Sequence, residues 1–160
     1  MRILLATDGS GHSEAAVHEI ARQHWPAASA LRVISVVEPP YVLGTFPGES
    51  VNMDLYVEIE KSARDRARAA VEKAAAHLQA EEGSRQLTVT TEVLSGSAKR
   101  VILEDAEAFG ADLIVVGSHG HGMLDRFLLG SVSQAVAMHA RCSVEIVRSP
   151  ITPTSDGAPR

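Results

Sequence analysis

A glycine-rich stretch is the part of this sequence whose residue types and spacing could do chemistry. Gly117 and Gly120 follow a short apolar run, nine residues separate Gly120 from Gly130, and a helical pattern begins at Ser131. Phosphates need several N–H donors and no side chain in the way; glycine removes the side chain and permits positive φ, and a helix N-terminus adds free N–H groups and a favourable dipole. The stretch predicts a phosphate site between the two glycines and residues 130–133. The alternative is a tight turn with Ser131 as an ordinary helix cap.

Two other phosphate-binding motifs do not match. A P-loop needs a glycine-lysine pair, and the chain contains none. A dinucleotide fingerprint begins at Gly9 and Gly11, but Glu14 occupies the position of the third glycine. A glutamate there repels a pyrophosphate and crowds the contact between helix and sheet. We therefore do not expect NAD or FAD as a ligand.

Asp8 is the second candidate, because it follows the first predicted strand directly. A carboxylate beside a phosphate group can accept ribose hydroxyls or help to hold Mg²⁺. In the alternative interpretation, Asp8 only accepts N–H groups of its own turn. We favour the ligand and metal role, because ligands of parallel α/β sheets bind at the carboxyl ends of the strands.

Three further side chains carry weaker signals. His119 and His121 form a His-x-His pair, but a zinc site needs three or four ligands, so we interpret the pair as a polar loop tip. Cys142 is expected to be a small, half-buried apolar residue rather than a reactive thiol. We recognise no catalytic constellation, which favours binding over turnover.

The elements that must position these residues alternate between strand and helix patterns. Apolar, β-branched runs predict strands, and apolar residues at helical spacing predict helices. The predicted strands are 3–6, 31–37, 87–94, 113–116 and 143–147, and the predicted helices are 13–24, 54–82, 98–109 and 131–140. In the long helix, Leu55, Ile59, Ala63 and Ala67 begin the expected apolar face. Residues 39–53 have no clear period and predict a loop.

This alternation predicts a single doubly wound α/β fold: a five-stranded, mainly parallel sheet with helices on both faces. Such sheets bind ligands where the strand order reverses. The site is therefore expected in the loops that start at Thr7, Glu38 and Gly117. We assign residues 1–148 to one nucleotide-binding domain and expect the proline-containing tail, 149–160, to be disordered.

Composition limits the possible partners and the compartment. The chain has 160 residues, a net charge of −5 and dispersed basic residues, which argues against nucleic acid or an anionic membrane as a partner. One cysteine allows no internal disulfide, and no apolar run approaches the roughly 20 residues of a membrane helix. We expect a soluble, cytoplasmic protein.

The motifs together resemble the universal stress protein family. Gly117-x-x-Gly120, followed after nine residues by Gly130-Ser131, is similar to that family's ATP-binding signature. The opening Ile-Leu-Leu-Ala-Thr-Asp-Gly-Ser, residues 3 to 10, resembles its first strand and turn. The segments 111–117, 128–133 and 142–144 resemble its fourth strand, last helix and last strand. The resemblance covers residues 1 to about 148 in the expected order.

The resemblance implies that the protein binds ATP with Mg²⁺ and acts as a regulatory stress-response module. By this analogy, Asp8 lies near the ribose and phosphates, and Val36 offers its backbone to the adenine. The implied binding residues are Thr7, Asp8, Val36, Val116, Gly117, Gly120, His121, Gly130, Ser131, Val132 and Ser133. Many relatives have arginine at the position of His121, so an arginine-like charge is missing there.

The resemblance also implies a homodimer, and the residues suggest how it forms. Segment 143–148 is the last strand, and an edge strand offers unpaired N–H and C=O groups to a second copy. We expect Glu145 of one copy to approach Arg148 of the other. Two alternatives to an ATP-binding regulatory module stay open: a slow ATPase or nucleotidyl-transferring enzyme on the same fold, and a dimeric interaction module that needs no nucleotide.

Overall fold

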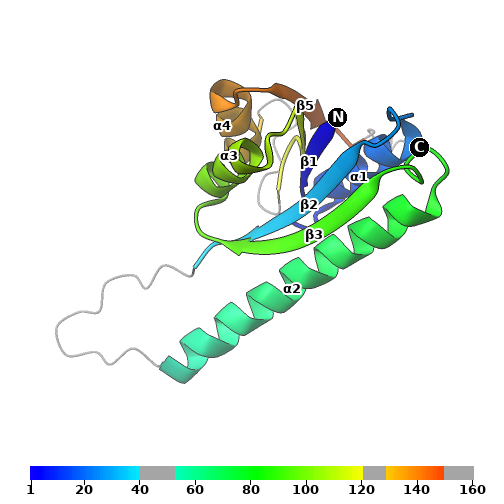
Figure 1. The fold of residues 1–160 in the computed structure, drawn as a ribbon. Helices are drawn as coiled ribbons and strands as arrows, with labels where there is room; N and C mark the ends of the chain where they lie inside the picture. Colours follow the sequence, from blue (N-terminus) through cyan, green and yellow to red (C-terminus); the bar gives the residue numbers. More distant parts are fainter. Residues whose placement is uncertain (40–52, 121–128, 150–160) are drawn as a thin grey trace, which may run out of the picture.

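A computed structural model of the chain describes residues 1–39, 53–120 and 129–149. Strands and helices alternate along the chain, as the hydrophobic pattern predicts (Figure 1). The strands are β1 (Arg2–Ala6), β2 (Ala30–Val37), β3 (Thr88–Ser95), β4 (Leu113–Gly117) and β5 (Ser143–Val147). The helices are α1 (Gly11–Arg22), α2 (Met53–Ala80), α3 (Ala98–Phe109) and α4 (Ser131–His139).

The strands form one sheet in the order β3-β2-β1-β4-β5, and every described pair of neighbours is parallel. Leu5 in the central strand lies opposite Val33 of β2 on one side and Val115 of β4 on the other. The chain runs outward from β1 to β3 and then returns to the other side of β1 for β4 and β5. The strand order therefore reverses beside β1, which confirms the predicted doubly wound α/β fold.

Two apolar cores lie on opposite faces of the sheet. On one face, α1 and α2 pack against the sheet with Ile20, Val71 and Leu78 fully or almost fully buried. On the other face, α3 and α4 do so with Ile102 and Val136. Alternate side chains of the buried strands point into one core or the other, which explains why β1, β2 and β4 read as nearly continuous apolar runs.

Local signals in the sequence account for the ends of two helices. The Ser10 hydroxyl accepts a hydrogen bond from the Ser13 N–H at 3.3 Å and caps the start of α1. At the end of α3, Gly110 adopts φ 67° and ψ 46°, the left-handed conformation that glycine reaches without a steric penalty.

The apolar face predicted for the long helix is only half correct. From Ala67 onward the inward positions of α2 are buried, but Leu55 and Ile59 are 53% and 46% exposed. The first part of α2 extends past the sheet (Figure 1). Leu55 and Ile59 have the predicted helical spacing but stay exposed, because that spacing shows which residues share a face and not how far the neighbouring sheet reaches.

β5 lies at one edge of the sheet, as expected for the last strand. The Glu145 carboxylate, however, accepts a hydrogen bond from the Gln23 side chain of the same protomer at 3.3 Å, and Arg148 lies beyond the end of β5. The structure therefore gives no support to the expected contact of Glu145 with Arg148 of a second copy. The dimer itself stays a prediction.

Several predictions concern residues outside the described ranges. The loop 39–53 falls almost entirely in the undescribed segment 40–52, His121 lies in 121–128, and the tail after Ser149 lies in 150–160. Within the described ranges, no helix combines the length and the apolar character that crossing a membrane requires.

Candidate functional site

A cavity of about 540 Å³ opens where the strand order reverses, at the carboxyl ends of β1, β2 and β4. We call it the glycine-loop cavity. Its size lies within the usual range for small-molecule sites, roughly 300–1,000 Å³. All the predicted site residues that the structure describes line it: Thr7, Asp8, Val36, Val116, Gly117, Gly120, Gly130, Ser131, Val132 and Ser133. The fold thus brings together positions from four separate parts of the chain.

Backbone hydrogen bonds hold the two described ends of the glycine loop in place. The Ser118 N–H donates to the Val147 carbonyl at 2.8 Å, and the Gly130 N–H donates to the Ser118 carbonyl at 2.8 Å. The second bond joins the residue after β4 to the residue before α4. The start of α4 is therefore held beside the end of β4, although most of the loop lies between them in the sequence.

The sequence interpretation noted that glycine permits positive φ, but Gly117, Gly120 and Gly130 do not use it and instead allow close approach. Among the described residues, the glycines with positive φ are Gly9, Gly96 and Gly110. A methyl group on Gly117 would lie 2.6 Å from the carbonyl carbon of His12 in α1. A methyl group on Gly130 would lie 3.1 Å from the Ser118 carbonyl oxygen. The backbone of the loop can thus pack tightly against its neighbours.

The first turn of α4 supplies the hydrogen-bond donors of the site. Its N-cap residue, Gly130, has no side chain and makes no side-chain capping bond. The first backbone bond of this helix runs from the Gln134 N–H to the Gly130 carbonyl at 2.9 Å. The N–H groups of residues 131–133 precede that bond and have no partner within the helix, and all three residues line the cavity. Free N–H groups at a helix N-terminus attract anions.

The two serines of this turn do not play equal parts. Ser131 is exposed at the cavity, as predicted. Ser133 is only 3% exposed, and its hydroxyl lies 2.9 Å from both the Ser118 and the Gly130 carbonyls. Its proton is therefore used within the protein. Ser133 thus fixes the loop to α4, while the exposed Ser131 leaves the first helical position open to a ligand.

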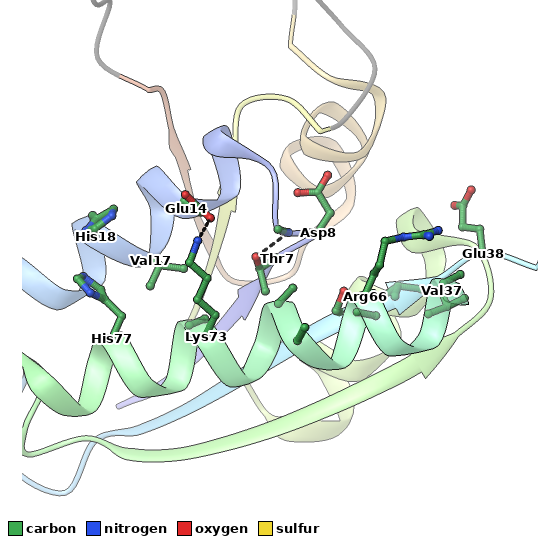
Figure 2. Close-up of a pocket in the computed structure, with 18 residues that line it drawn as sticks. Thr7, Asp8, Glu14, Val17, His18, Val37, Glu38, Arg66, Lys73 and His77 are labelled. Carbon is green, nitrogen blue, oxygen red and sulfur yellow. Dashed lines mark hydrogen bonds and ion pairs between the residues drawn. The ribbon is translucent and has the colours of Figure 1, made fainter. Parts of the chain in front are cut away.

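Thr7 and Asp8 shape the turn after β1. The Thr7 hydroxyl accepts from the Gly9 N–H at 3.2 Å (Figure 2). It donates to the Ser13 hydroxyl at 3.0 Å. One Asp8 oxygen accepts from the Ser10 N–H at 3.0 Å, as the turn interpretation expects. The other lies beside Gly120, where a methyl group would approach it to 2.7 Å. Asp8 thus combines the two roles considered from the sequence: it stabilises its turn and presents a carboxylate to the cavity.

Sequence reasoning did not assign the start of α3 to the site. Ser97, Ala98 and Lys99 line the glycine-loop cavity, and Lys99 brings a positive charge. Glu38, just after β2, accepts a hydrogen bond from the Ala98 N–H at 2.9 Å. Ser97 directly before a predicted helix signalled a helix start. Only the packing of α3 beside α4 places that start at the cavity.

His119 lies at the same cavity with one ring nitrogen unsatisfied. Its Nδ1 is 3.2 Å from the Ser118 hydroxyl, and its ring centroid is 5.2 Å from that of His12. Its Nε2 is buried without a hydrogen-bond partner among the described residues. His121 and Asp125 lie outside the described residues. Within the ranges that the structure covers, no three His, Cys, Asp or Glu side chains gather as a metal site.

A nucleotide-bound Mg²⁺ makes a smaller demand on the protein than a zinc site. Mg²⁺ keeps several waters and is held by substrate phosphates together with one or two carboxylates. Asp8, at the cavity and opposite the start of α4, fits that limited role. Cys142 is half-buried among apolar side chains of the α3–α4 core, as expected. Burial and, next, the charge of Asp112 raise the pKa of its thiol.

Comparison with known proteins connects this geometry to a family. The model of the universal stress protein family matches residues 1–148. A universal stress protein of Methanocaldococcus jannaschii, MJ0531, is 37% identical over 152 residues, which cover 93% of this chain and 82% of the relative.

Solved structures show the same fold. A protein known as hypothetical protein MJ0577 superimposes with a TM-score of 0.77 at 23% identity, covering 93% of this chain and 96% of that one. An Arabidopsis thaliana family member with AMP bound has a TM-score of 0.64 at 15% identity, with 97% of each chain covered. A universal stress protein in complex with cAMP has a TM-score of 0.51 at 27% identity, with 92% and 96% covered. The family match over nearly the whole described chain and the close relative agree: this chain belongs to the universal stress protein family.

Proposed function

We propose that the protein binds ATP together with Mg²⁺ in the glycine-loop cavity and acts as a stress-response regulatory module. One observation carries the proposal. The first turn of α4, whose N–H groups have neither a helical partner nor a side-chain cap, lines a cavity of about 540 Å³ where the strand order reverses. That combination suits a phosphate chain. Family structures with AMP and cAMP bound support an adenine nucleotide as the ligand class.

Each part of the cavity has a role in this proposal. The N–H groups of residues 131–133 bind phosphate oxygens, and Lys99, at the start of α3, adds positive charge to the cavity lining. The Asp8 carboxylate accepts ribose hydroxyls or a water of the Mg²⁺ shell. The Val36 backbone, at the end of β2, meets the adenine. Val116, Gly117 and Gly120 form the wall, and we include His121 as a backbone contact.

We propose a regulatory role because a bound nucleotide would contact several separate elements of the fold at once. The cavity is lined by the turn after β1, the start of α3, the end of β4 and the start of α4. A bound nucleotide therefore links elements from both halves of the sheet. A short connection joins the end of α4 to the start of β5. A change in the position of α4 can therefore reach the strand that we propose forms the dimer. Residues 1–148 form the binding domain in this proposal, and its location is the cytoplasm.

A charge placed at the start of α4 tests the proposal. Ser131 is exposed and stands at the first helical position, where glutamate suits the helix dipole. Ser131→Glu should therefore fold normally but repel phosphates and weaken MgATP binding at least about tenfold, whereas Ser131→Gln, the neutral control of the same shape, should stay within about threefold of wild type. Calorimetry measures both affinities, and circular dichroism checks the fold.

Thermal unfolding gives an independent reading. MgATP at about 100 times its dissociation constant adds about 2.7 kcal/mol to the free energy of unfolding. For a chain of this size that raises the melting temperature by about 5–10 °C. A wild-type protein that shows no shift with saturating MgATP, AMP or cAMP would overturn the proposal. Equal MgATP affinity in Ser131→Glu and Ser131→Gln would move the phosphates away from α4.

A further inference from the structure

A second cavity, larger than the first, lies on the other side of the β1 turn. Its volume is about 820 Å³, and it is enclosed by α1, α2 and the ends of β1 and β2 (Figure 2). We call it the α2 cavity. It shares Thr7, Asp8, Val36 and Glu38 with the glycine-loop cavity, but its remaining lining comes from other residues. Among the described residues, none of the glycine loop or of α4 lines it.

The cavity exists because α2 presents alanines where larger residues would fill the space. Ala63, Ala67, Ala70 and Ala74 follow one another at helical spacing and line the cavity from the α2 side. One turn further on, Leu78 is fully buried and packs in the core. An alanine methyl group is too short to fill the space that a leucine side chain fills, so this part of α2 leaves a cavity between itself and the neighbouring elements. We call the alanines that line it the alanine floor.

The rim of the α2 cavity is polar, and two of its carboxylates, Asp8 and Glu38, accept the backbone N–H groups of Ser10 and Ala98. Lys73 of α2 forms an ion pair with Glu14 of α1 (Figure 2). The His18 and His77 rings meet edge to face with their centroids 4.3 Å apart. These contacts join α1 to α2 across one end of the cavity and use the polar groups that lie there.

Of the lysine and the arginine that line the cavity, Arg66 is the one that forms no ion pair among the described residues, and it is exposed. It lines the same cavity, and one of its guanidinium nitrogens donates to the Ser62 hydroxyl one turn earlier at 2.8 Å. Within the described ranges, no carboxylate lies at ion-pair distance from it. Figure 2 shows its side chain rising from α2, with the guanidinium group directed to the side where Glu38 lies. A planar guanidinium with donors to spare is suited to bind a carboxylate, sulfonate or phosphate group.

We propose that the α2 cavity is a second ligand site, which takes a small amphipathic organic anion. The apolar body of the ligand lies against the alanine floor and Val17, and its acidic group pairs with Arg66. A volume of about 820 Å³ suits an organic molecule of the size that pockets of this kind enclose. The alanines and Arg66 line this cavity and not the glycine-loop cavity, so the contacts that would hold this ligand differ from those proposed for the nucleotide, although the two cavities share the turn after β1 and the end of β2.

Two related dyes test the apolar floor and the cation separately. Anilinonaphthalene sulfonate has an aromatic body and one acidic group, and N-phenylnaphthylamine has a similar body without the charge. We expect one equivalent of the sulfonate to bind with enhanced fluorescence. Arg66→Gln should weaken the sulfonate about tenfold and leave the neutral dye within about threefold. Arg68→Gln is the matched control, because Arg68 is exposed on the same helix and does not line the cavity.

Filling the cavity tests its position. Ala67→Leu should weaken both dyes at least about tenfold, because the larger side chain occupies the floor, while helix propensity hardly changes. Ala63→Leu provides a second filling variant if Ala67→Leu lowers stability. We avoid Ala70, whose Cβ lies against the Gly9 turn. Ala76→Leu, on the exposed side of α2, is the control and should bind both dyes as wild type does.

Three results would overturn the proposal. The first is no saturable binding of the sulfonate by the folded wild-type protein. The second is stoichiometric displacement of the dye by MgATP, or its loss in Ser131→Glu, which would put it in the glycine-loop cavity. The third is equal binding by the filling variants and Ala76→Leu. Because Ser131→Glu tests the nucleotide site and Ala67→Leu tests the α2 cavity, failure of one proposal does not imply failure of the other.

Discussion

Gly117 and His12 are in such close contact that no side chain fits between them. A methyl group on Gly117 would lie 2.6 Å from both the carbonyl carbon and the carbonyl oxygen of His12. The end of β4 therefore rests directly on the backbone of the first turn of α1. This contact joins two elements that line the two sides of the glycine-loop cavity, and neither residue can yield by rotating a side chain.

We therefore expect Gly117→Ala to lower the free energy of unfolding by about 1–3 kcal/mol, the usual range for overpacking. Urea denaturation measures the difference. Gly11→Ala is the control, because nothing lies within 4 Å of a methyl group there and the residue is helical. It should leave stability unchanged or raise it by up to about 1 kcal/mol. Equal stability of the two variants would mean that β4 and α1 can move apart freely.

Gly120 approaches a side chain rather than a backbone. Its methyl group would lie 2.7 Å from Oδ2 of Asp8, and a carboxylate can rotate away. Gly120→Ala should therefore reduce stability less than Gly117→Ala but displace Asp8 and weaken MgATP binding about tenfold. A double-mutant cycle measured by calorimetry separates the two effects. In an Asp8→Ala background, Gly120→Ala should have little further effect on affinity; a full additional loss would show that Gly120 acts without Asp8.

The sequence predicted the fold well because independent signals agreed. The apolar run of β1 ends at Thr7 and Asp8, Ser10 caps α1, and Gly110 ends α3 where predicted. The candidate site followed from the same logic, since the ends of parallel strands and the following helix starts meet at one edge of a sheet. Asp8 and Ser131 could be assigned to one cavity in this way without a structure.

Three features could not be predicted from the sequence: the exposed start of α2, the α2 cavity and the position of Lys99. Each depends on distances between elements, which a local sequence pattern does not give. Helix α2 has 28 residues and is about 42 Å long, whereas an eight-residue strand such as β2 spans about 26 Å. Part of the helix must project, so Leu55 is exposed. The alanines that line the α2 cavity have the same spacing as alanines in a closed core, and only the packing distance distinguishes them. Lys99 reaches the site only because α3 packs beside α4.

The raised pKa of the Cys142 thiol predicts low reactivity. Burial disfavours the thiolate, and the charge of Asp112 adds to this. A raised pKa means that the thiolate fraction is below that of a free cysteine near pH 8 and keeps rising at pH values where a free thiol is already ionised. Reaction with an aromatic disulfide reagent, followed against pH, should show this late rise. Asp112→Asn should shift the profile to lower pH, and an unchanged profile would leave burial as the only cause.

The last prediction concerns the edge strand β5, through which we expect two copies to form a dimer. The Ser143 N–H donates to the Asp112 carbonyl at 3.3 Å, and the Val147 carbonyl accepts from Ser118 at 2.8 Å, so both residues direct their backbone groups toward β4. Because these groups alternate along a strand, those of Val144 and Ile146 point to the open edge. Ile146→Pro therefore removes an outward N–H and leaves the ladder to β4 intact.

Sedimentation or light scattering at high micromolar concentration should show a dimer for the wild type and a monomer for Ile146→Pro. Ile146→Ala is the control, since it also removes apolar contacts with the α3–α4 core but keeps the N–H, and it should remain dimeric. The two-fold pairing would be antiparallel and self-complementary, with four outward groups per copy, the N–H and C=O of Val144 and Ile146, available for new hydrogen bonds. A monomeric wild type would exclude this dimer. A dimeric Ile146→Pro variant would place the interface on another surface, because a strand without that N–H cannot complete the new ladder.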